Sequence, residues 1–304
     1  MGYIYLFIVA LMFSFGGTWV KLIQPYFNST FITFFRFVVG VLWLMFLKSV
    51  IQRSIRVDRK ACTKYVLLWA FIGGAAKWLA YLCENYGLSH GNSYGNIVLQ
   101  PAQMIFVTFA SVLLFKEKLS LRKWIGIVMC LCGVLLISWN GRPLSSFWGS
   151  NALLTVLFLI SGAMAGLHII SQKMTADRVN MLDGNLLTFL ISAALAFLPV
   201  LPQIPEAAPV SHGLKNNLLL ILALVMFGCN TGVGFYLNAK AMKLVPLYIV
   251  PIIQSTMVFF SILWGILFFH ETITGYTTGG TLLFVIGIIT IQLKFPSKSG
   301  NAPE

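Results

Sequence analysis

A lysine, a tyrosine and a glutamate lie within one long apolar stretch, residues 64–87. Tyr81 and Glu84 follow Lys77 by four and seven residues, so the three side chains share one face of a helix. Because Lys77 lies about 20 Å along that helix, it is near or just past the middle of a bilayer core of about 30 Å. A lysine at that depth costs ~2.5–3.5 kcal/mol and should face the protein interior. Such a cation could attract a carboxylate or phosphate, or could titrate during transport.

Each of these side chains also has a structural explanation. Lys77 could pair with Glu84 or snorkel toward the membrane surface, although its depth makes snorkelling awkward. Glu84 lies about 10 Å further along the helix, where it could act as a gate, a proton acceptor or a solvated interfacial residue. Trp78 could stack on a ring of the solute or belong to the aromatic belt of the membrane interface.

A second apolar stretch, residues 215–238, carries polar side chains at matching depth. Thr231 stands where Lys77 stands in the first stretch, and Asn230 precedes it. An amide in lipid must find hydrogen-bond partners, so it faces protein or water. For these residues, and for Gln100 and Gln254 elsewhere, solute binding and interhelical hydrogen bonding are equally good explanations. The predicted substrate-binding set is Lys77, Trp78, Tyr81, Glu84, Gln100, Asn230, Thr231 and Gln254.

Four further ionisable residues are expected to have structural roles. Arg36 is expected to fix helix packing or to contact lipid phosphate, and His168 to be a satisfied helical histidine. Glu117 and Glu271 end apolar segments beside basic residues such as Lys116, Lys118 and His270. Ion pairs that hold these segment ends are the expected arrangement.

The composition is that of a protein solvated by lipid. The chain has 304 residues, 58% of them hydrophobic and 10% charged, with a mean hydropathy of +0.86; soluble proteins carry roughly a quarter charged residues. Ten apolar segments are long enough to span a bilayer, which predicts an all-α polytopic membrane protein. These segments are 3–23, 30–50, 64–87, 92–115, 122–139, 149–173, 182–201, 215–238, 246–269 and 274–293.

Lysine and arginine predict the orientation of the ten spans. With the amino terminus in the cytoplasm, most of the 21 basic residues fall in cytoplasmic loops, and only Arg142 and Lys215 fall in loops on the other side. This bias predicts that both termini are cytoplasmic. The net charge of +13 is therefore a topology signal and a contact for anionic membrane lipid. A nucleic-acid partner is not expected.

The two halves of the chain repeat each other. Tyr94–Glu117 matches Tyr248–Glu271 without gaps at a shift of 154 residues, and Gln100 falls on Gln254. The predicted repeats are residues 1–140 and 141–304. Since each repeat has an odd number of spans, the second must be inverted in the membrane. Inverted repeats suit a carrier, because exchanging the conformations of the halves exchanges the two open states.

At this point the chain resembles the EamA-type branch of the drug/metabolite transporter superfamily. The resemblance rests on the segment from Pro101 to Glu117 with Gly126 and Gly133, and on its second copy through Glu271, Gly280 and Gly287. It implies a secondary carrier of the bacterial inner membrane, a multi-pass protein that most often exports amino acids, metabolites or toxic compounds. One departure is Ser255 in place of Pro101, with Pro251 lying earlier, so the two helices are expected to bend at different depths.

Other function classes have weaker support. The chain has no GxxxxGK[ST] loop for ATP, and none of HExxH, GxSxG or paired intramembrane aspartates. The five cysteines lack metal-ligand spacing, so no metal or cofactor is expected. A membrane-embedded enzyme and a non-transporting scaffold or receptor are the alternatives to a carrier. Protons are a candidate coupling ion, whereas the substrate, the direction of transport and the oligomeric state have no signature in the sequence.

Overall fold

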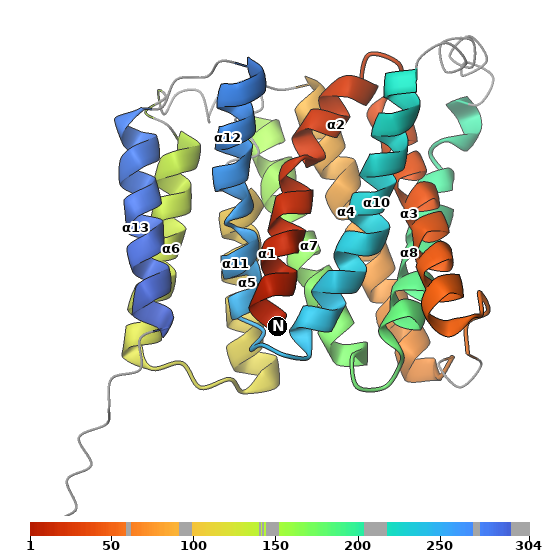
Figure 1. The fold of residues 1–304 in the computed structure, drawn as a ribbon, viewed down its shortest axis with the longest axis horizontal. Coiled ribbons are helices and arrows are strands. Elements are labelled where there is room, and N and C mark those ends of the chain that lie inside the picture. Colours follow the sequence, from red (N-terminus) through yellow and green to blue (C-terminus); the bar gives the residue numbers. More distant parts are fainter. Residues whose placement is uncertain are drawn as a thin grey trace, which may run out of the picture.

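The computed structural model describes residues 1–58, 62–90, 99–139, 141, 143, 152–203, 218–269 and 274–292, and their regular structure is helical throughout (Figure 1). The helices are α1 (Gly2–Ser14), α2 (Gly16–Ile23), α3 (Ser29–Gln52), α4 (Lys64–His90), α5 (Leu99–Phe115), α6 (Leu121–Trp139), α7 (Ala152–Thr175), α8 (Met181–Phe197), α10 (Leu218–Met242), α11 (Ile249–Gln254), α12 (Met257–Phe269) and α13 (Gly275–Gln292). The predicted all-α class is confirmed. Five helical segments in these ranges are long and apolar enough to cross a membrane.

Two of the predicted spans are each made of two helices. The first changes direction at Phe15, between α1 and α2, and the ninth opens at Ser255 and Thr256, between α11 and α12. At the second break the hydroxyls of Ser255 and Thr256 donate to the carbonyls of Pro251 and Ile253, at 2.7 and 2.6 Å. α5 runs unbroken through Pro101 because that proline lies in its first turn, where no helical N–H is needed.

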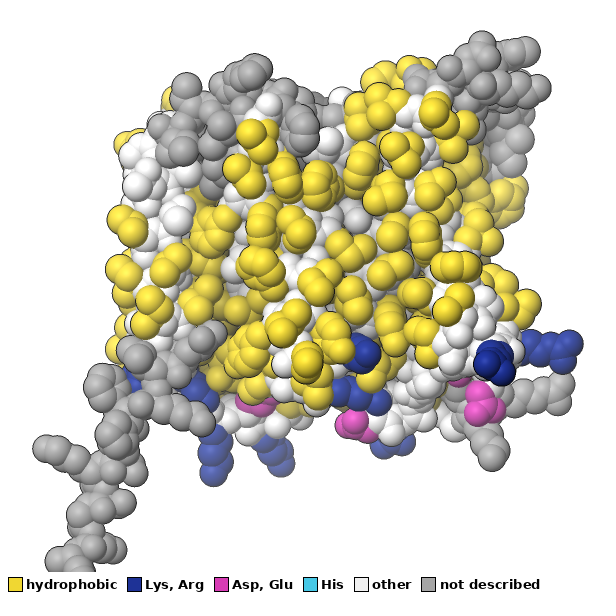
Figure 2. All heavy atoms as spheres, in the orientation of Figure 1, with side chains coloured by type: hydrophobic (Ala, Val, Ile, Leu, Met, Phe, Trp, Pro, Cys, Tyr) yellow, Lys and Arg dark blue, Asp and Glu magenta, His cyan; other side chains and the backbone are white. Residues whose placement is uncertain are grey.

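The basic side chains gather at one end of the molecule, next to a broad hydrophobic surface (Figure 2). At this end, called the basic end below, α3, α5, α7 and α10 finish and α4, α6 and α8 begin. The start of α1 lies here too, since the Lys240 Nζ is 4.9 Å from the ring centroid of Tyr5. Arg142 and Lys215, the two residues predicted for the other side, lie outside the described residues.

α6 and α13 pack against each other at one edge of the bundle (Figure 1). Their glycines face each other across the contact. A Cβ on Gly133 would lie 2.7 Å from the Gly280 carbonyl oxygen, and a Cβ on Gly126 would lie 2.8 Å from that of Gly287. These four glycines are matched by the 154-residue shift, Gly126 with Gly280 and Gly133 with Gly287. In space Gly126 meets Gly287 and Gly133 meets Gly280, so the glycine that comes first in one helix lies beside the one that comes second in the other. The two matched helices therefore run antiparallel.

Gly280 and its neighbour Gly279 offer a matched test of this close packing. Gly280→Val should lower the free energy of unfolding by about 1–3 kcal/mol, because the side chain would overlap the α6 backbone. Gly279→Val should have a much smaller effect, since a Cβ there meets nothing within 4 Å. Thermal unfolding of both variants in detergent measures the difference. Equal stability of the two variants would contradict the close packing of α6 and α13.

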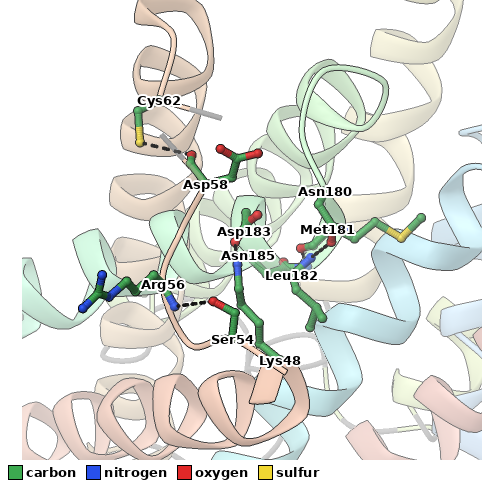
Figure 3. A network of polar contacts seen from close by, with 10 residues as sticks. All are labelled: Lys48, Ser54, Arg56, Asp58, Cys62, Asn180, Met181, Leu182, Asp183 and Asn185. Carbon is green, nitrogen blue, oxygen red and sulfur yellow. Dashed lines mark hydrogen bonds and ion pairs between the residues drawn. The ribbon is translucent and has the colours of Figure 1, made fainter. Parts of the chain in front are cut away.

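α3 and α8 are also antiparallel. The tilted rings of Phe37 and Phe189 have centroids 5.8 Å apart, and those of Phe34 and Phe197 have centroids 5.4 Å apart. At the basic end an ion pair joins Lys48 of α3 to Asp183 in the first turn of α8 (Figure 3). Lys48 is therefore a buried ion and not one of the solvated basic residues of this end, because only 2% of its surface is exposed. The carboxylate of Asp183 offsets its charge and also lies at the favourable end of the α8 dipole.

Candidate functional site

The ring of Tyr81 lies beside two buried cations in the interior of the bundle. The guanidinium carbon of Arg36, from α3, is 3.4 Å from the ring centroid, and the Nζ of Lys77, one turn earlier on α4, is 4.0 Å from it. Arg36 and Lys77 are each 6% exposed. The prediction that Lys77 faces the protein interior is therefore confirmed.

The second half of the chain completes this site through α10. Phe227 lies 4.1 Å from the Arg36 guanidinium, and the ring centroid of Phe235 lies 4.6 Å from the Lys77 Nζ. The Arg36 Nε donates a hydrogen bond to the Thr231 Oγ1 at 3.0 Å. Tyr81 and Phe235 are matched by the 154-residue shift, so each repeat supplies one ring to Lys77. We call Arg36, Lys77, Tyr81, Phe227, Thr231 and Phe235 the cation–aromatic site.

The cation–aromatic site has positive charge without a bound carboxylate. Among the described residues, Lys48 and Asp183 form the one ion pair with a nitrogen–oxygen distance within 4.0 Å. Neither Arg36 nor Lys77 therefore has an acidic partner at that distance in this part of the chain. Cation–π contacts contribute about 2 kcal/mol when desolvated, which is less than the several kcal/mol that burying an ion costs. The site is therefore electrostatically complementary to an anion.

The other residues predicted on α4 do not form a direct ion pair with Lys77 among the described residues. Glu84 is half-buried further along the helix and makes no ion pair with Lys77 within the described part of the chain. The structural explanation by a Lys77–Glu84 pair is therefore wrong for this conformation. Trp78 packs against the cluster that contains Phe37 and Tyr81, and its buried Nε1 has no hydrogen-bond partner among the described residues. Trp78 therefore borders the cation–aromatic site.

Asn230 has a structural partner away from the cation–aromatic site. Its Nδ2 donates to the Met12 carbonyl oxygen at 2.8 Å, next to the break between α1 and α2. For this residue the geometry favours the interhelical hydrogen bond over solute binding. Thr231, the next residue, faces Arg36 instead.

Gln254 belongs to a chain of buried amides that crosses the bundle. The Nε2 of Gln103 donates to Gln254 at 3.1 Å, and the Nε2 of Gln254 donates to Asn238 at 2.9 Å. Asn238 in turn donates to Gln172 at 3.3 Å, and Gln172 donates to Asn185 at 2.6 Å. This amide chain joins α5, α11, α10, α7 and α8.

A small, partly open hollow adjoins the amide chain near the basic end. Gln172 and Asn185 line it, together with Thr175, Ala176 and Thr188. Gln100 lies apart from the amide chain, where its Nε2 is 3.6 Å from the Met257 sulfur and its Oε1 has no partner among the described residues. Gln100 and Gln254 thus have different environments in this conformation despite their matched positions.

His168 borders the cation–aromatic site and shares Phe235 with it. Its ring centroid lies 5.0 Å from that of Phe235 and 5.6 Å from that of Phe189. The Nδ1 lies 3.1 Å from the Gly73 carbonyl oxygen, whereas the buried Nε2 has no hydrogen-bond partner among the described residues. The expectation of a satisfied structural histidine therefore holds for one ring nitrogen.

Glu117 fastens α5 to the second half of the chain. Its carboxylate accepts the N–H groups of Leu247 and Tyr248 at 2.8 and 3.4 Å, just before α11. The anchoring role is confirmed, but the expected ion pairs with Lys116 and Lys118 do not form. Tyr94, His270 and Glu271 lie outside the described residues.

Three members of the cation–aromatic site were not predicted. Arg36 was assigned to helix packing or lipid phosphate; its hydrogen bond to Thr231 fits packing, but its burial excludes lipid phosphate. The cost of a charge inside an apolar span was the signal that could have identified it. Phe235 could have been found as the residue matched to Tyr81, whereas nothing in the sequence distinguishes Phe227 from other phenylalanines. In the amide chain, Gln103, Gln172, Asn185 and Asn238 were not singled out.

Comparisons with known proteins agree with this architecture. The model of the EamA-like transporter family matches the chain over residues 1–139 and 153–293. Solute carrier family 35 member B1 of Mus musculus is 25% identical over 264 residues, 83% of this chain and 78% of the relative. An uncharacterized transporter of Haemophilus influenzae is 23% identical, covering 87% of this chain and 83% of the relative.

Two further similarities extend over nearly the full length. The uncharacterized transporter YoaV of Bacillus subtilis is 23% identical over 95% of this chain and 96% of its own. A solved crystal structure of a protein shares the fold with a TM-score of 0.74 at 15% identity, covering 96% of both chains. The family model covers most of the sequence in two parts that correspond to its two halves. The chain belongs to the EamA-like transporter family and is a multi-pass membrane transporter.

Proposed function

We propose that this protein is a secondary carrier for a small organic solute that bears an anionic group. The observation that supports this is the cation–aromatic site, in which Arg36 and Lys77 are buried beside Tyr81 without a carboxylate within 4.0 Å in the described residues. A carboxylate or phosphate of the solute would supply the missing negative charge. Amino acids, related metabolites and anionic toxic compounds are the candidate substrates.

The chemistry of the cation–aromatic site favours anions over organic cations. Arginine retains its charge when buried, and a second positive group nearby would be repelled strongly in a medium of low dielectric constant. The rings of Tyr81, Phe227 and Phe235 offer apolar faces for the rest of the solute. An elongated molecule with one acidic end and an apolar or aromatic body fits this combination.

Alternating access is the proposed mechanism. The antiparallel packing of matched helices, α3 with α8 and α6 with α13, supports two inverted repeats, residues 1–140 and 141–304. We infer from the positive-inside rule that the basic end faces the cytoplasm of a bacterial inner membrane. The expected direction is export, with protons as the candidate coupling ion.

Reconstituted flux tests this proposal. Purified protein in liposomes is assayed against a panel of radiolabelled metabolites, with and without a pH gradient. We expect saturable movement of one or more anionic solutes, and a response to the gradient if protons are coupled. Binding without movement in every condition would overturn the carrier in favour of a receptor or scaffold. Chemical conversion of a solute would instead reveal an enzyme.

A further inference from the structure

The contacts of the two repeats establish which residues occupy equivalent positions. Gly74 of α4 packs against Ile191 of α8, and Gly228 of α10 packs against Val39 of α3. Gly228 follows Gly74 by 154 residues, and Ile191 follows Val39 by 152. The same contact therefore occurs twice, once with each repeat supplying the glycine. This repetition establishes that each residue of α4 is equivalent to the residue of α10 that lies 154 positions later.

The same correspondence holds for α5 and the broken helix α11–α12. Gln103 donates to Gln254 at 3.1 Å, and Gln100 lies 3.6 Å from the sulfur of Met257. At a shift of 154 residues, Gln254 corresponds to Gln100 and Met257 to Gln103. The two contacts are thus counterparts, with one amide replaced by a thioether.

One hydrogen bond of the amide chain lacks its counterpart in this conformation. Gln254 donates to Asn238 at 2.9 Å, and the equivalent residues are Gln100 and Glu84. These two make no hydrogen bond with each other in the described residues, where the Gln100 Oε1 has no partner. Glu84 is half-buried, on the part of α4 that lies away from the basic end. The pair nearer the basic end is therefore formed and its counterpart is not.

We propose that Gln100 and Glu84 form an alternate gate, which closes when the Gln254–Asn238 pair opens. The inference rests on the proposed alternating access, in which each repeat adopts the conformation of the other. In the alternate state the Gln100 Nε2 donates to the Glu84 carboxylate. The Gln254–Asn238 pair and its neighbours in the amide chain then separate, and the hollow beside Gln172 and Asn185 opens toward the basic end.

The two gates differ in chemistry. Gln254–Asn238 joins two neutral amides, whereas Gln100–Glu84 pairs an amide with a carboxylate. Hydrogen bonds to ionised groups are about twice as strong as neutral ones. The amide chain near the basic end has no complete counterpart, because Met257 stands where the matching amide would be. The stronger hydrogen bond of the alternate gate compensates for the free energy of these missing amide contacts. Glu84 is accordingly a positioning residue that acts on the equilibrium between conformations.

Accessibility of a reporter cysteine tests the two gates without any solute. Ala176 lines the hollow and is buried, so Ala176→Cys is placed in a background without the five native cysteines. Its rate of labelling by a membrane-impermeant maleimide from the basic side reports opening there. Asn238→Ala should raise that rate about tenfold, the effect of losing one to two buried hydrogen bonds.

Glu84 variants supply the matched comparison. Added to Asn238→Ala, Glu84→Ala should return the labelling rate toward that of the parent, because the alternate state loses its own gate. Glu84→Gln, which retains an acceptor, should keep much of the increase. An increase that is the same whether Glu84 is retained or replaced by glutamine or alanine would overturn the proposal.

Cross-linking of the Gln100→Cys with Glu84→Cys pair, which retains Asn238, keeps the proposal testable if Asn238→Ala fails to fold. The cysteine pairs Gln254→Cys with Asn238→Cys, and Gln100→Cys with Glu84→Cys, are each treated with a short bis-methanethiosulfonate, which joins the two thiols through mixed disulfides and releases two sulfinates. Both pairs should cross-link, and each should then fix the Ala176→Cys labelling rate in opposite directions, low for the first and high for the second. Failure of the second pair, or identical labelling, would overturn the gate. Flux of the parent protein is measured separately, so a failed gate is distinguished from a failed carrier.

Discussion

Lys77→Met should abolish most anion transport while making the empty protein more stable. The Nζ of Lys77 is buried against the rings of Tyr81 and Phe235 without an acidic partner in the described residues. Removing it deprives a bound anion of a desolvated charge, which is worth about 2–5 kcal/mol and corresponds to a loss of about 30-fold or more in affinity. The unfolding midpoint of the empty protein should rise, because an uncompensated buried charge disappears.

The opposite signs of these two effects separate a binding role from a structural one. A lysine held for packing would lose stability on replacement, and transport would fall only with the amount of folded protein. Lys64→Met, at the exposed start of α4, is the matched control and should change neither quantity. Flux per folded molecule and thermal unfolding in detergent are the two measurements. If Lys77→Met folds normally and transports every solute as the parent does, the binding role of Lys77 is wrong.

The second large effect is expected at the buried ion pair between Lys48 and Asp183. Asp183→Leu should lower the free energy of unfolding by about 3–5 kcal/mol, because Lys48 is left buried without its partner. The double variant Lys48→Met with Asp183→Leu should recover most of that loss, since two apolar side chains can pack where the ions met. Denaturant unfolding of the two single variants and the double variant completes the cycle.

A much smaller loss of unfolding free energy in Asp183→Leu would contradict this account of the α3–α8 contact. So would a double variant as unstable as the less stable single one, because the cost would then come from lost packing and not from the unpaired charge. Added salt should also have little effect on the stabilisation by this ion pair, since its side chains are only 2% and 4% exposed. Insensitivity of the parent's stability to added salt is therefore part of the same prediction.

The spans and the repeat could be predicted because they depend on local composition. A run of apolar residues must form a helix in lipid, where every backbone group needs a partner inside its own segment. Lys77 stood out for the same reason, as a charge at a depth where charge is costly. Gln254 also stood out because it lies within an apolar run, and Glu117 because it ends one.

The partners of these residues could not be predicted, because helix rotation and neighbours are set by tertiary packing. Lys48 lies near the end of a span, where a solvated lysine is the usual arrangement, and only the position of Asp183 on α8 makes it a buried ion. Arg36 meets Tyr81 because α3 and α4 pack together, and Phe227 joins them from a helix far along the chain. The amide chain likewise depends on five helices meeting in one register.

The most direct test of the central claim compares matched solutes that differ only in charge. Carboxylates and their uncharged amides are titrated onto the protein in nanodiscs, and binding is followed by thermal stabilisation and calorimetry, with the parent and with Lys77→Met. We predict that one or more carboxylates bind the parent, that the corresponding amides bind at least about 30-fold more weakly, and that Lys77→Met removes this difference. Equal binding of carboxylate and amide by the parent, or an unchanged preference in Lys77→Met, would contradict an anion site at Arg36 and Lys77.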